Sequence, residues 1–237
     1  MQVVRAKGYS ATTVDELCAA AGVTKGAFFH HFSSKQDLAI EAARHFAAMA
    51  ERLFTAVPYL ALPDPVERLL AYVELRKALL RGELPEFTCL LGTMVQEAYQ
   101  THPEIRAACE ECLGEHLTML EADIAEAQQR SGHSGQWSPA SLAAYMQAVI
   151  QGAFVLAKAQ QGSAVAMDCL DHLGRYLRLL FGHTKRGKQD VHQDNRPSSA
   201  SGQRRARRVR AGSGAGRRGE VSAPGAHLRI PHQRSAD

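Results

Sequence analysis

The chain has 237 residues, of which 45% are hydrophobic, and its 28 Lys+Arg against 24 Asp+Glu give a formal net charge of +4. This length and composition exclude a wholly disordered chain and are sufficient for one or two domains with buried cores. The charge is unevenly distributed, because residues 1–184 carry 15 − 20 = −5 and residues 185–237 carry 13 − 4 = +9.

The first clearly predicted helix spans about residues 13–21. Thr13 and Glu16 have the spacing of a capping box, in which each side chain satisfies a backbone group at the helix start. Gly22 follows, and glycine readily adopts the left-handed conformation that ends a helix. The pattern predicts a short amphipathic helix whose apolar face consists of Val14, Leu17, Cys18 and Ala21.

A second short helix is predicted over about residues 25–32, after a turn through Val23 and Thr24, with Phe28 and Phe32 facing inward. Ser34 is positioned to cap a longer helix that begins at Lys35. Two short helices joined by a tight turn form a helix-turn-helix, whose second helix enters the major groove of double-stranded DNA with its first residues against the bases. Those residues are Thr24, Lys25, Gly26 and Ala27.

The chain from residue 47 to residue 184 is predicted to be helical, because no run shows sustained two-residue alternation. Helical spacing places four sets of residues on buried faces: Val66, Leu69, Leu70, Val73 and Leu80; Ile105, Ala108, Cys112, Leu120 and Ile124; Leu142, Tyr145, Met146, Val149, Ala153 and Leu156; and Leu170, Leu173, Leu177, Leu180 and Phe181. The last two helices, about residues 138–160 and 164–181, are apolar around much of their circumference. This favours a homodimer in which they pair into a four-helix interface.

Residues 131–157 contain no Asp, Glu, Lys or Arg and are the best candidate for a membrane span. Their hydropathy is lowered by polar residues, among them Ser138, Gln147 and Gln151, and by Pro139. We interpret the segment as a buried helix of a soluble protein and expect no membrane partner.

The N-terminal motifs are Gly8-Tyr9, Thr12-Thr13-Val14, Ala21–Gly26, His31-Phe32 and Ser34-Lys35. With these motifs, residues 5–46 resemble the TetR family of bacterial transcription regulators. The resemblance implies an all-α fold with a helix-turn-helix DNA-binding domain at residues 1–46 and a helical effector-binding and dimerisation domain at residues 47–184. It also implies a repressor that a small-molecule effector releases from operator DNA.

The resemblance assigns DNA contacts position by position. Thr13 and Thr24 would contact phosphates from helix starts, and Lys35 would approach the DNA backbone. Phe29 stands where the family usually has Tyr, so the phosphate contact of that hydroxyl is lost or replaced. The expected DNA-binding residues are Thr13, Thr24, Lys25, Gly26, Ala27, Phe29, His30, His31 and Lys35.

The family's first helix normally begins well before the Gly-Tyr pair, whereas only Met1–Lys7 precede Gly8 here. This predicts an incomplete first helix, either because the start codon was placed too far downstream or because the domain is damaged. An alternative function follows, namely a helical ligand-binding dimer that has lost operator binding.

Helical bundles often enclose ligand pockets. Seven residues are expected to line one here, although their helical spacing also fits a plain core: Phe87, Cys89, Met94, His116, Met119, Tyr145 and Phe154. No nucleophile, base and orienting group occur together, and no phosphate-binding glycine loop is present. We therefore expect neither catalysis nor a cofactor.

The five cysteines are odd in number and scattered, which argues against a disulfide framework and for a reducing compartment such as the cytoplasm. Cys109, Cys112 and His116 have a helical spacing that can offer three ligands to zinc, so a metal sensor or helical enzyme is a further alternative. The other interpretation, in which both cysteines are small core residues and no metal binds, is the one we adopt.

Residues 185–237 contain no Phe, Trp or Tyr and are predicted to be a disordered basic tail. Their arginines, concentrated at residues 204–210 and 217–218, would add salt-dependent DNA affinity. The interpretation we favour is instead a non-functional extension, because the abrupt change of composition after Gly182 resembles translation in a shifted reading frame.

Overall fold

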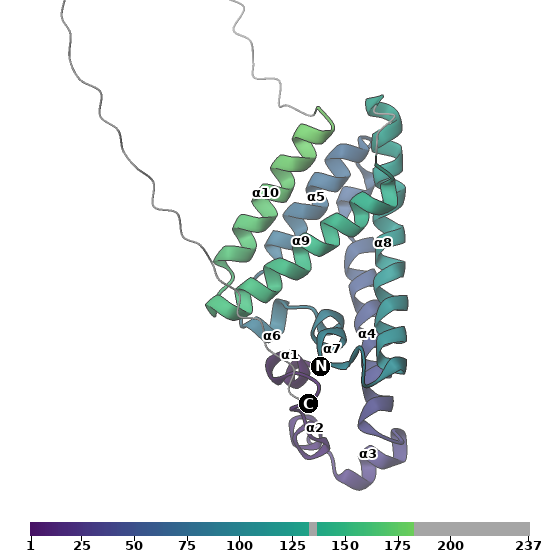
Figure 1. Ribbon diagram of the computed structural model, residues 1–237, viewed down its shortest axis with the longest axis vertical. Coiled ribbons are helices and arrows are strands. Elements are labelled where there is room, and N and C mark those ends of the chain that lie inside the picture. The colour runs from purple at the N-terminus through teal and green to yellow at the C-terminus, as the bar shows by residue number, and fades with distance from the viewer. Residues whose placement is uncertain (133–136, 183–237) are drawn as a thin grey trace, which may run out of the picture. The chain divides into compact units, whose positions relative to one another are not determined.

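A computed structural model describes residues 1–132 and 137–182, and this part of the chain is helical without any strand, as the sequence predicts (Figure 1). The predicted tail lies outside the described residues. The N-terminal helices are α1 (Gln2–Lys7), α2 (Val14–Ala21), α3 (Lys25–His31) and the long α4 (Lys35–Thr55). After the short 3-10 helix η1 (Pro58–Ala61) come α5 (Pro65–Ala78), α6 (Leu84–Phe87), α7 (Leu90–Ala98), α8 (Pro103–Ser131), α9 (Pro139–Gln160) and α10 (Ala164–Leu180).

The predicted helix starts are confirmed by side-chain caps. Thr13 Oγ1 accepts a hydrogen bond from the Glu16 amide at 3.2 Å, and the Glu16 carboxylate accepts one from the Thr13 amide at 2.9 Å. Thr24 and Ser34 accept bonds from the amides of Ala27 and Asp37, both at 3.1 Å. Gly22 ends α2 with φ of 67°, in the left-handed region that glycine adopts without strain. These caps fix where α3 begins and therefore which residues it exposes first.

The larger of two hydrophobic clusters is formed mainly by α5, α8, α9 and α10. Most of the predicted buried faces lie in it, and fully buried examples are Leu69, Ile124, Met146 and Leu173. Tyr145 and Leu156 were also predicted to be buried, but both are exposed, because they lie on the side of α9 that faces away from this core.

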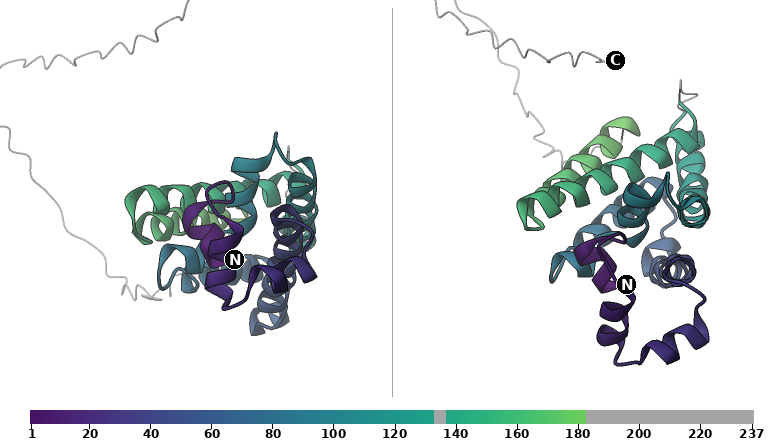
Figure 2. Two further views of the ribbon diagram at one scale, coloured as in Figure 1. Left: turned by 90° about the horizontal axis from the view of Figure 1, so that it is seen from below. Right: turned by 60° about the horizontal axis from the view of Figure 1, so that its bottom comes forward.

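The smaller cluster joins the N-terminal helices to the rest of the described chain. Tyr9, Ala39 and Ala43 pack there against α7 and against the first turns of α8. Since α4 runs from Lys35 to Thr55, it passes without a break through residue 46, where we predict the boundary between the two domains. Helix α1 packs beside α6 and α7, as Figure 2 shows.

Among the described helices, α9 alone is long and apolar enough to cross a membrane by length and composition. However, Leu142, Met146, Ile150 and Phe154 on one side of α9 are buried in the larger cluster. The segment is therefore a helix that packs in the protein core, as the sequence predicts.

Candidate functional sites

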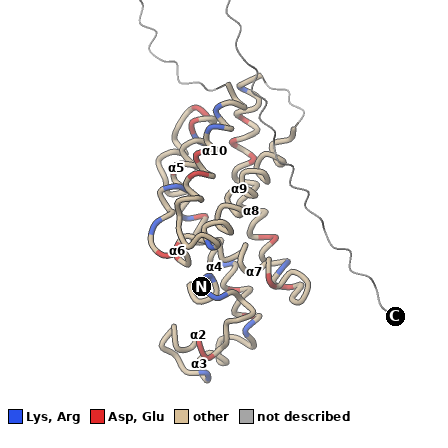
Figure 3. Tube along the Cα trace, turned by 60° about the vertical axis from the view of Figure 1, so that its left-hand side comes forward, with Lys and Arg blue, Asp and Glu red and all other residues tan. Residues whose placement is uncertain are grey.

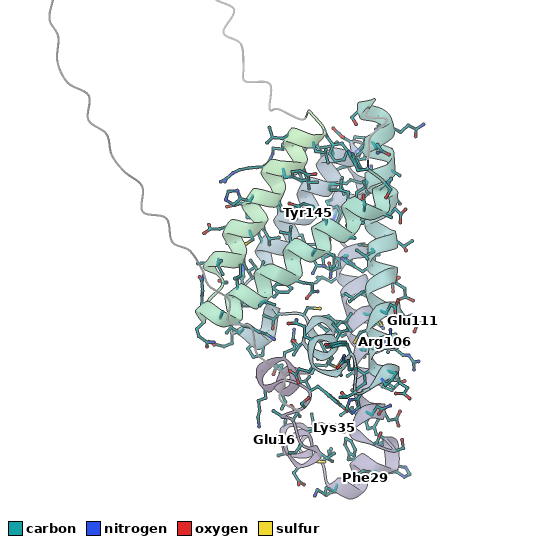
Figure 4. The ribbon with its side chains drawn as sticks, in the orientation of Figure 1. Glu16, Phe29, Lys35, Arg106, Glu111 and Tyr145 are labelled. Atoms are coloured by element: carbon teal, nitrogen blue, oxygen red, sulfur yellow. The ribbon has the colours of Figure 1, made fainter. Side chains whose placement is uncertain are left out.

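Helix α3 exposes nearly all its side chains. Phe28 is the buried residue that anchors α3 to the protein, and its ring contacts those of Phe29 and Phe32 at 5.1 and 5.6 Å between centroids. Phe29 is 54% exposed and lies at the far end of the N-terminal helices (Figure 4). Thr24, Lys25, Gly26, Ala27, His30 and His31 are all exposed as well. The predicted DNA-binding residues of α3 therefore share one accessible helix surface.

The charges beside α3 are largely compensated within the protein. Lys25 forms an exposed ion pair with Asp15 of α2 at 2.8 Å, and the hydrogen bond that its ammonium donates to that carboxylate raises the pKa of Lys25. Lys7 pairs with Glu16. The hydrogen bonds that the Glu16 carboxylate accepts from Lys7 and from the Thr13 amide lower its pKa to about 2. An acidic segment of α2 therefore lies next to the basic start of α3 (Figure 3). A phosphate group that approaches Lys25 must compete with Asp15.

Lys35 is not free on this surface in the structure. Its ammonium group donates hydrogen bonds to the carbonyl oxygens of Tyr9 and Thr12, at 3.0 and 2.9 Å, and lies 4.3 Å from the centre of the Tyr9 ring. Lys35 thus ties the start of α4 to the loop between α1 and α2. To reach a DNA phosphate it would have to share or break these bonds.

A cavity of about 440 Å³ lies between α4, α5, α8, α9 and the α6–α7 segment. Five of the seven residues predicted for an effector pocket line it: Phe87, Cys89, His116, Met119 and Phe154. The structure does not bring the other two into this cavity. Met94 is fully buried in the smaller cluster, and Tyr145 is 46% exposed on the outer side of α9 (Figure 4).

Three polar side chains form a hydrogen-bonded group in this region. Arg76 Nε donates to the Tyr72 hydroxyl at 2.8 Å, and His116 Nε2 lies 2.9 Å from Arg76 Nη2 and 2.8 Å from the Tyr72 hydroxyl. Burial, together with the adjacent guanidinium, lowers the pKa of His116 to about 3. The imidazole is consequently neutral at physiological pH, and Arg76 carries the positive charge of the group.

Two amide side chains on α9 complete the polar part of the cavity lining. Gln147 Oε1 and Gln151 Nε2 are buried atoms that find no hydrogen-bond partner in residues 1–132 and 137–182, and both residues line the cavity. A buried polar atom without a partner costs free energy, so these two atoms mark a place where a ligand can supply the missing bonds. Neither glutamine is among the predicted site residues, although two glutamines about one turn apart in an apolar helix indicate a polar site.

The titration of His116 predicts that acid destabilises the fold. The unfolded chain protonates histidine near its ordinary pKa of 6.5, whereas folded His116 stays neutral down to about 3. The unfolded state thus binds more protons between these values, and the stability that His116 contributes above pH 6.5 is lost as the pH falls, at up to about 1.4 kcal/mol per pH unit. Urea unfolding between about pH 5 and pH 7 measures this slope. The His116→Gln variant should show a shallower one, and identical slopes would contradict the assignment.

The cysteine cluster is arranged as core and not as ligands. Cys109 is fully buried, and burial raises the pKa of its thiol to about 12. Burial likewise raises the pKa of Cys112, while His116 is bonded to Tyr72 and Arg76. In residues 1–132 and 137–182, no group of three His, Cys, Asp or Glu side chains is arranged to hold a metal ion. The structure therefore gives no support to the metal-sensor alternative.

Arg5 joins the N-terminal helices to the cavity wall. Its guanidinium donates to the carbonyl oxygens of Glu86 and Thr88, at 3.3 and 3.0 Å, and lies 5.7 Å from the centre of the Phe46 ring. Glu86 and Thr88 flank Phe87, and both Phe87 and Phe46 line the cavity. A movement of the cavity wall at Phe87 can therefore be transmitted to α1 through the side chain of Arg5.

The Arg5→Met variant should loosen the N-terminal helices while the larger cluster stays intact. It keeps an apolar stem but removes two hydrogen bonds from a charged donor, a loss of about 1 to 3 kcal/mol in local stability. Amide hydrogen exchange should speed up in α1 to α3 and stay unchanged in α5, α9 and α10. The control is Lys7→Met, which removes only the exposed pair with Glu16 and should have little effect. Equal exchange in both variants would contradict the role of Arg5.

Adjacent surfaces of α9 and α10 carry exposed apolar side chains. Tyr145 and Tyr176 contact each other, with ring centroids 5.2 Å apart, and Leu179 is 75% exposed. Val155 and Leu156 are exposed on α9 as well. An apolar surface on neighbouring helices is typical of a protein–protein interface. It involves the same two helices as the predicted dimer contact.

Two family models match this chain. Residues 1–42 match the family model described as bacterial regulatory proteins, tetR family, and residues 65–173 match the tetracyclin repressor-like C-terminal domain. The HTH-type transcriptional repressor DhaR of Mycobacterium sp. (strain GP1) is 27% identical over 180 residues, which cover 76% of this chain and 85% of DhaR.

Solved structures share the fold. The crystal structure of regulatory protein TetR from Rhodobacter sphaeroides is 26% identical, with a TM-score of 0.65 over 73% of this chain and 92% of that one. A cysteine variant of the TetR family regulator CifR, whose structure includes a complex with 26-bp double-strand operator DNA, gives a TM-score of 0.62 at 18% identity. That match covers 73% of this chain and 91% of CifR.

Proposed function

The chain belongs to the tetR family of bacterial transcriptional regulators, and from this premise we propose that it represses transcription until a small molecule fills its cavity. The observation that carries the proposal is the combination of an exposed α3, held by a buried phenylalanine, with a cavity lined by two buried amide atoms that have no hydrogen-bond partner among the described residues. One feature suits DNA contact and the other suits ligand binding.

The DNA contacts follow from the exposed residues of α3. With its first turn in the major groove, Thr24, Lys25, Gly26 and Ala27 meet the base edges or phosphates, and Phe29, His30 and His31 follow on the same helix. Thr13 serves as the phosphate contact at the start of α2. Lys35 becomes a phosphate contact only if DNA binding displaces it from Tyr9 and Thr12.

The repressor acts as a homodimer through the exposed apolar surface of α9 and α10, as is typical of the family. A two-fold dimer places two copies of α3 in successive major grooves, with half-sites about 34 to 36 Å apart or a multiple of that distance. Its place of action is the cytoplasm, where bacterial DNA lies. No catalytic role is proposed, because family members regulate transcription.

Release from DNA requires an effector that binds more tightly to a second state of the dimer. In that state the two copies of α3 no longer fit into successive major grooves. Its effect is limited by the difference in its affinity for the two states. Arg5 and α4 link the cavity to the N-terminal helices and are the elements that carry this change. The alternative of a dimer that has lost operator binding is not favoured, because the DNA-binding family model matches residues 1–42 and DhaR is named a repressor.

Selection of genomic DNA fragments by the purified protein, followed by gel-shift titration, tests this function. Fragments with inverted repeats should be enriched, and they identify the operator. The matched control is Gly26→Glu, since an added Cβ would meet only the Thr24 hydroxyl at 3.7 Å, whereas the new carboxylate would oppose DNA. Equal enrichment by both proteins would show that α3 does not read the DNA.

A further inference from the structure

Arg76 is a partly buried cation whose direct contacts within the described residues are all with neutral groups. Within the described part of the chain it forms no ion pair, and its contacts are the neutral Tyr72 hydroxyl, the neutral His116 ring and the face of the Phe54 ring, 4.3 Å away. Its neighbour Lys77, by contrast, pairs with both Glu74 and Asp171. Because a desolvated charge costs free energy unless it is paired, this part of the cavity favours an anion.

The hydrogen-bonded group of Arg76, Tyr72 and His116 has more donors than acceptors. A guanidinium can only donate, so His116 Nε2 is the acceptor of the bond from Arg76 and the ring proton is assigned to Nδ1. The Tyr72 hydroxyl accepts from Arg76 Nε and lies 2.8 Å from the same His116 Nε2, so it shares the one lone pair of that nitrogen with Arg76 Nη2. Among the described residues no hydrogen bond uses Arg76 Nη1 or His116 Nδ1. Two donors, one of them charged, are thus available for a ligand.

The rest of the lining suits an organic ligand with one further polar group. Phe46, Phe87 and Phe154 offer aromatic contacts, while Gln147 and Gln151 supply one unused acceptor and one unused donor. The lining also includes the carboxylates of Glu51 and Glu115, but both residues are exposed, so water screens their charge.

We propose that the effector is a small amphipathic carboxylate whose head group binds Arg76 and His116 and whose apolar body lies against the phenylalanines. The planar guanidinium matches a carboxylate, and a single cation suits a single negative charge. A cavity of about 440 Å³ limits the ligand to a compact alkyl or aryl acid. This inference rests on the proposed function, because it names the ligand class of the same cavity.

Isothermal titration calorimetry with matched pairs tests it: octanoate against octanamide, and cinnamate against cinnamamide. At neutral pH each pair differs chiefly in charge, so the acid should bind the full-length protein about tenfold or more tightly than its amide. The Arg76→Gln variant should lose this preference. The matched control Arg81→Gln removes the same charge from an exposed residue outside the cavity lining and should retain it.

Three outcomes overturn the proposal: equal binding of acid and amide by the wild type, survival of the preference in Arg76→Gln, or no binding of either acid at millimolar concentration. Thermal unfolding of both variants, together with retention of amide binding by Arg76→Gln, shows whether the cavity is still formed. Operator release is measured separately by gel shift. If neutral compounds release the DNA and acids do not, the carboxylate proposal fails while the proposed function stands.

Discussion

The Lys25→Ala variant is expected to bind operator DNA at least about tenfold more weakly than the wild type, with about 1 to 3 kcal/mol lost per subunit. Lys25 is the lysine of α3, and it lies in the first turn, which would enter the major groove. In the free protein it makes only an exposed pair with Asp15, so its removal should leave folding and dimerisation unchanged. Fluorescence anisotropy at several salt concentrations measures the affinity, and circular dichroism checks the fold.

The partner of Lys25 provides the opposite test. Asp15→Asn frees Lys25 and removes a negative charge that lies next to the expected position of a phosphate. Operator affinity should therefore rise, by about 0.3 to 1 kcal/mol for a screened surface charge. Unchanged affinity in Lys25→Ala would remove Lys25 from the DNA contacts, and weaker binding by Asp15→Asn would mean that the pair positions α3.

Arg68→Ala is expected to have the largest effect on stability. The Arg68 guanidinium is nearly buried and bonds to three groups: Asp123 at 2.7 Å, Glu126, and the carbonyl oxygen of Leu62 at 2.9 Å. Its loss removes the cation that Asp123 and Glu126 share in a partly desolvated place, and breaking a buried pair costs about 3 to 5 kcal/mol. We expect the lower end of this range, because Glu126 retains 37% exposure. Urea unfolding monitored by circular dichroism measures the change.

Arg130→Ala is the matched control for that experiment. Arg130 also pairs with Glu126 but is 57% exposed, so water replaces its interactions and the cost should stay below about 1 kcal/mol. A comparable loss in the two variants would mean that burial of Arg68 is not what makes its pair important.

The local signals in the sequence predicted the helices well because each one acts over a few residues. Thr13 with Glu16, Thr24, and Ser138 all cap the helices that they precede, since a cap requires only a side chain beside its own backbone. The exposure of α3 followed from the same reasoning. The compensation of the charge on Lys25 could not be predicted in this way, because its pairing with Asp15 depends on how α2 packs against α3.

The cavity was predicted only in part, because helical periodicity indicates a buried side without saying what that side contacts. Tyr145 and Met94 both fit an apolar pattern, yet one is exposed on the outer side of α9 and the other packs in the smaller cluster. Arg76 gave no signal, since a cation between apolar positions looks like any solvated residue of an amphipathic helix. The role of Arg76 in the cavity depends on its contacts with Tyr72 and with His116, and His116 is distant in sequence.

Because α4 is one continuous helix, a small tilt at one of its ends displaces the other end by a larger distance. Its 21 residues span about 30 Å, with Lys35 at the end next to α3 and Phe54 at the end that lines the cavity. A tilt of about 5° around the cavity end would move the other end by about 2.5 Å, which is comparable to a hydrogen-bond length. In the proposed function, a ligand too small to push α3 directly would therefore shift it off its DNA contacts by tilting α4.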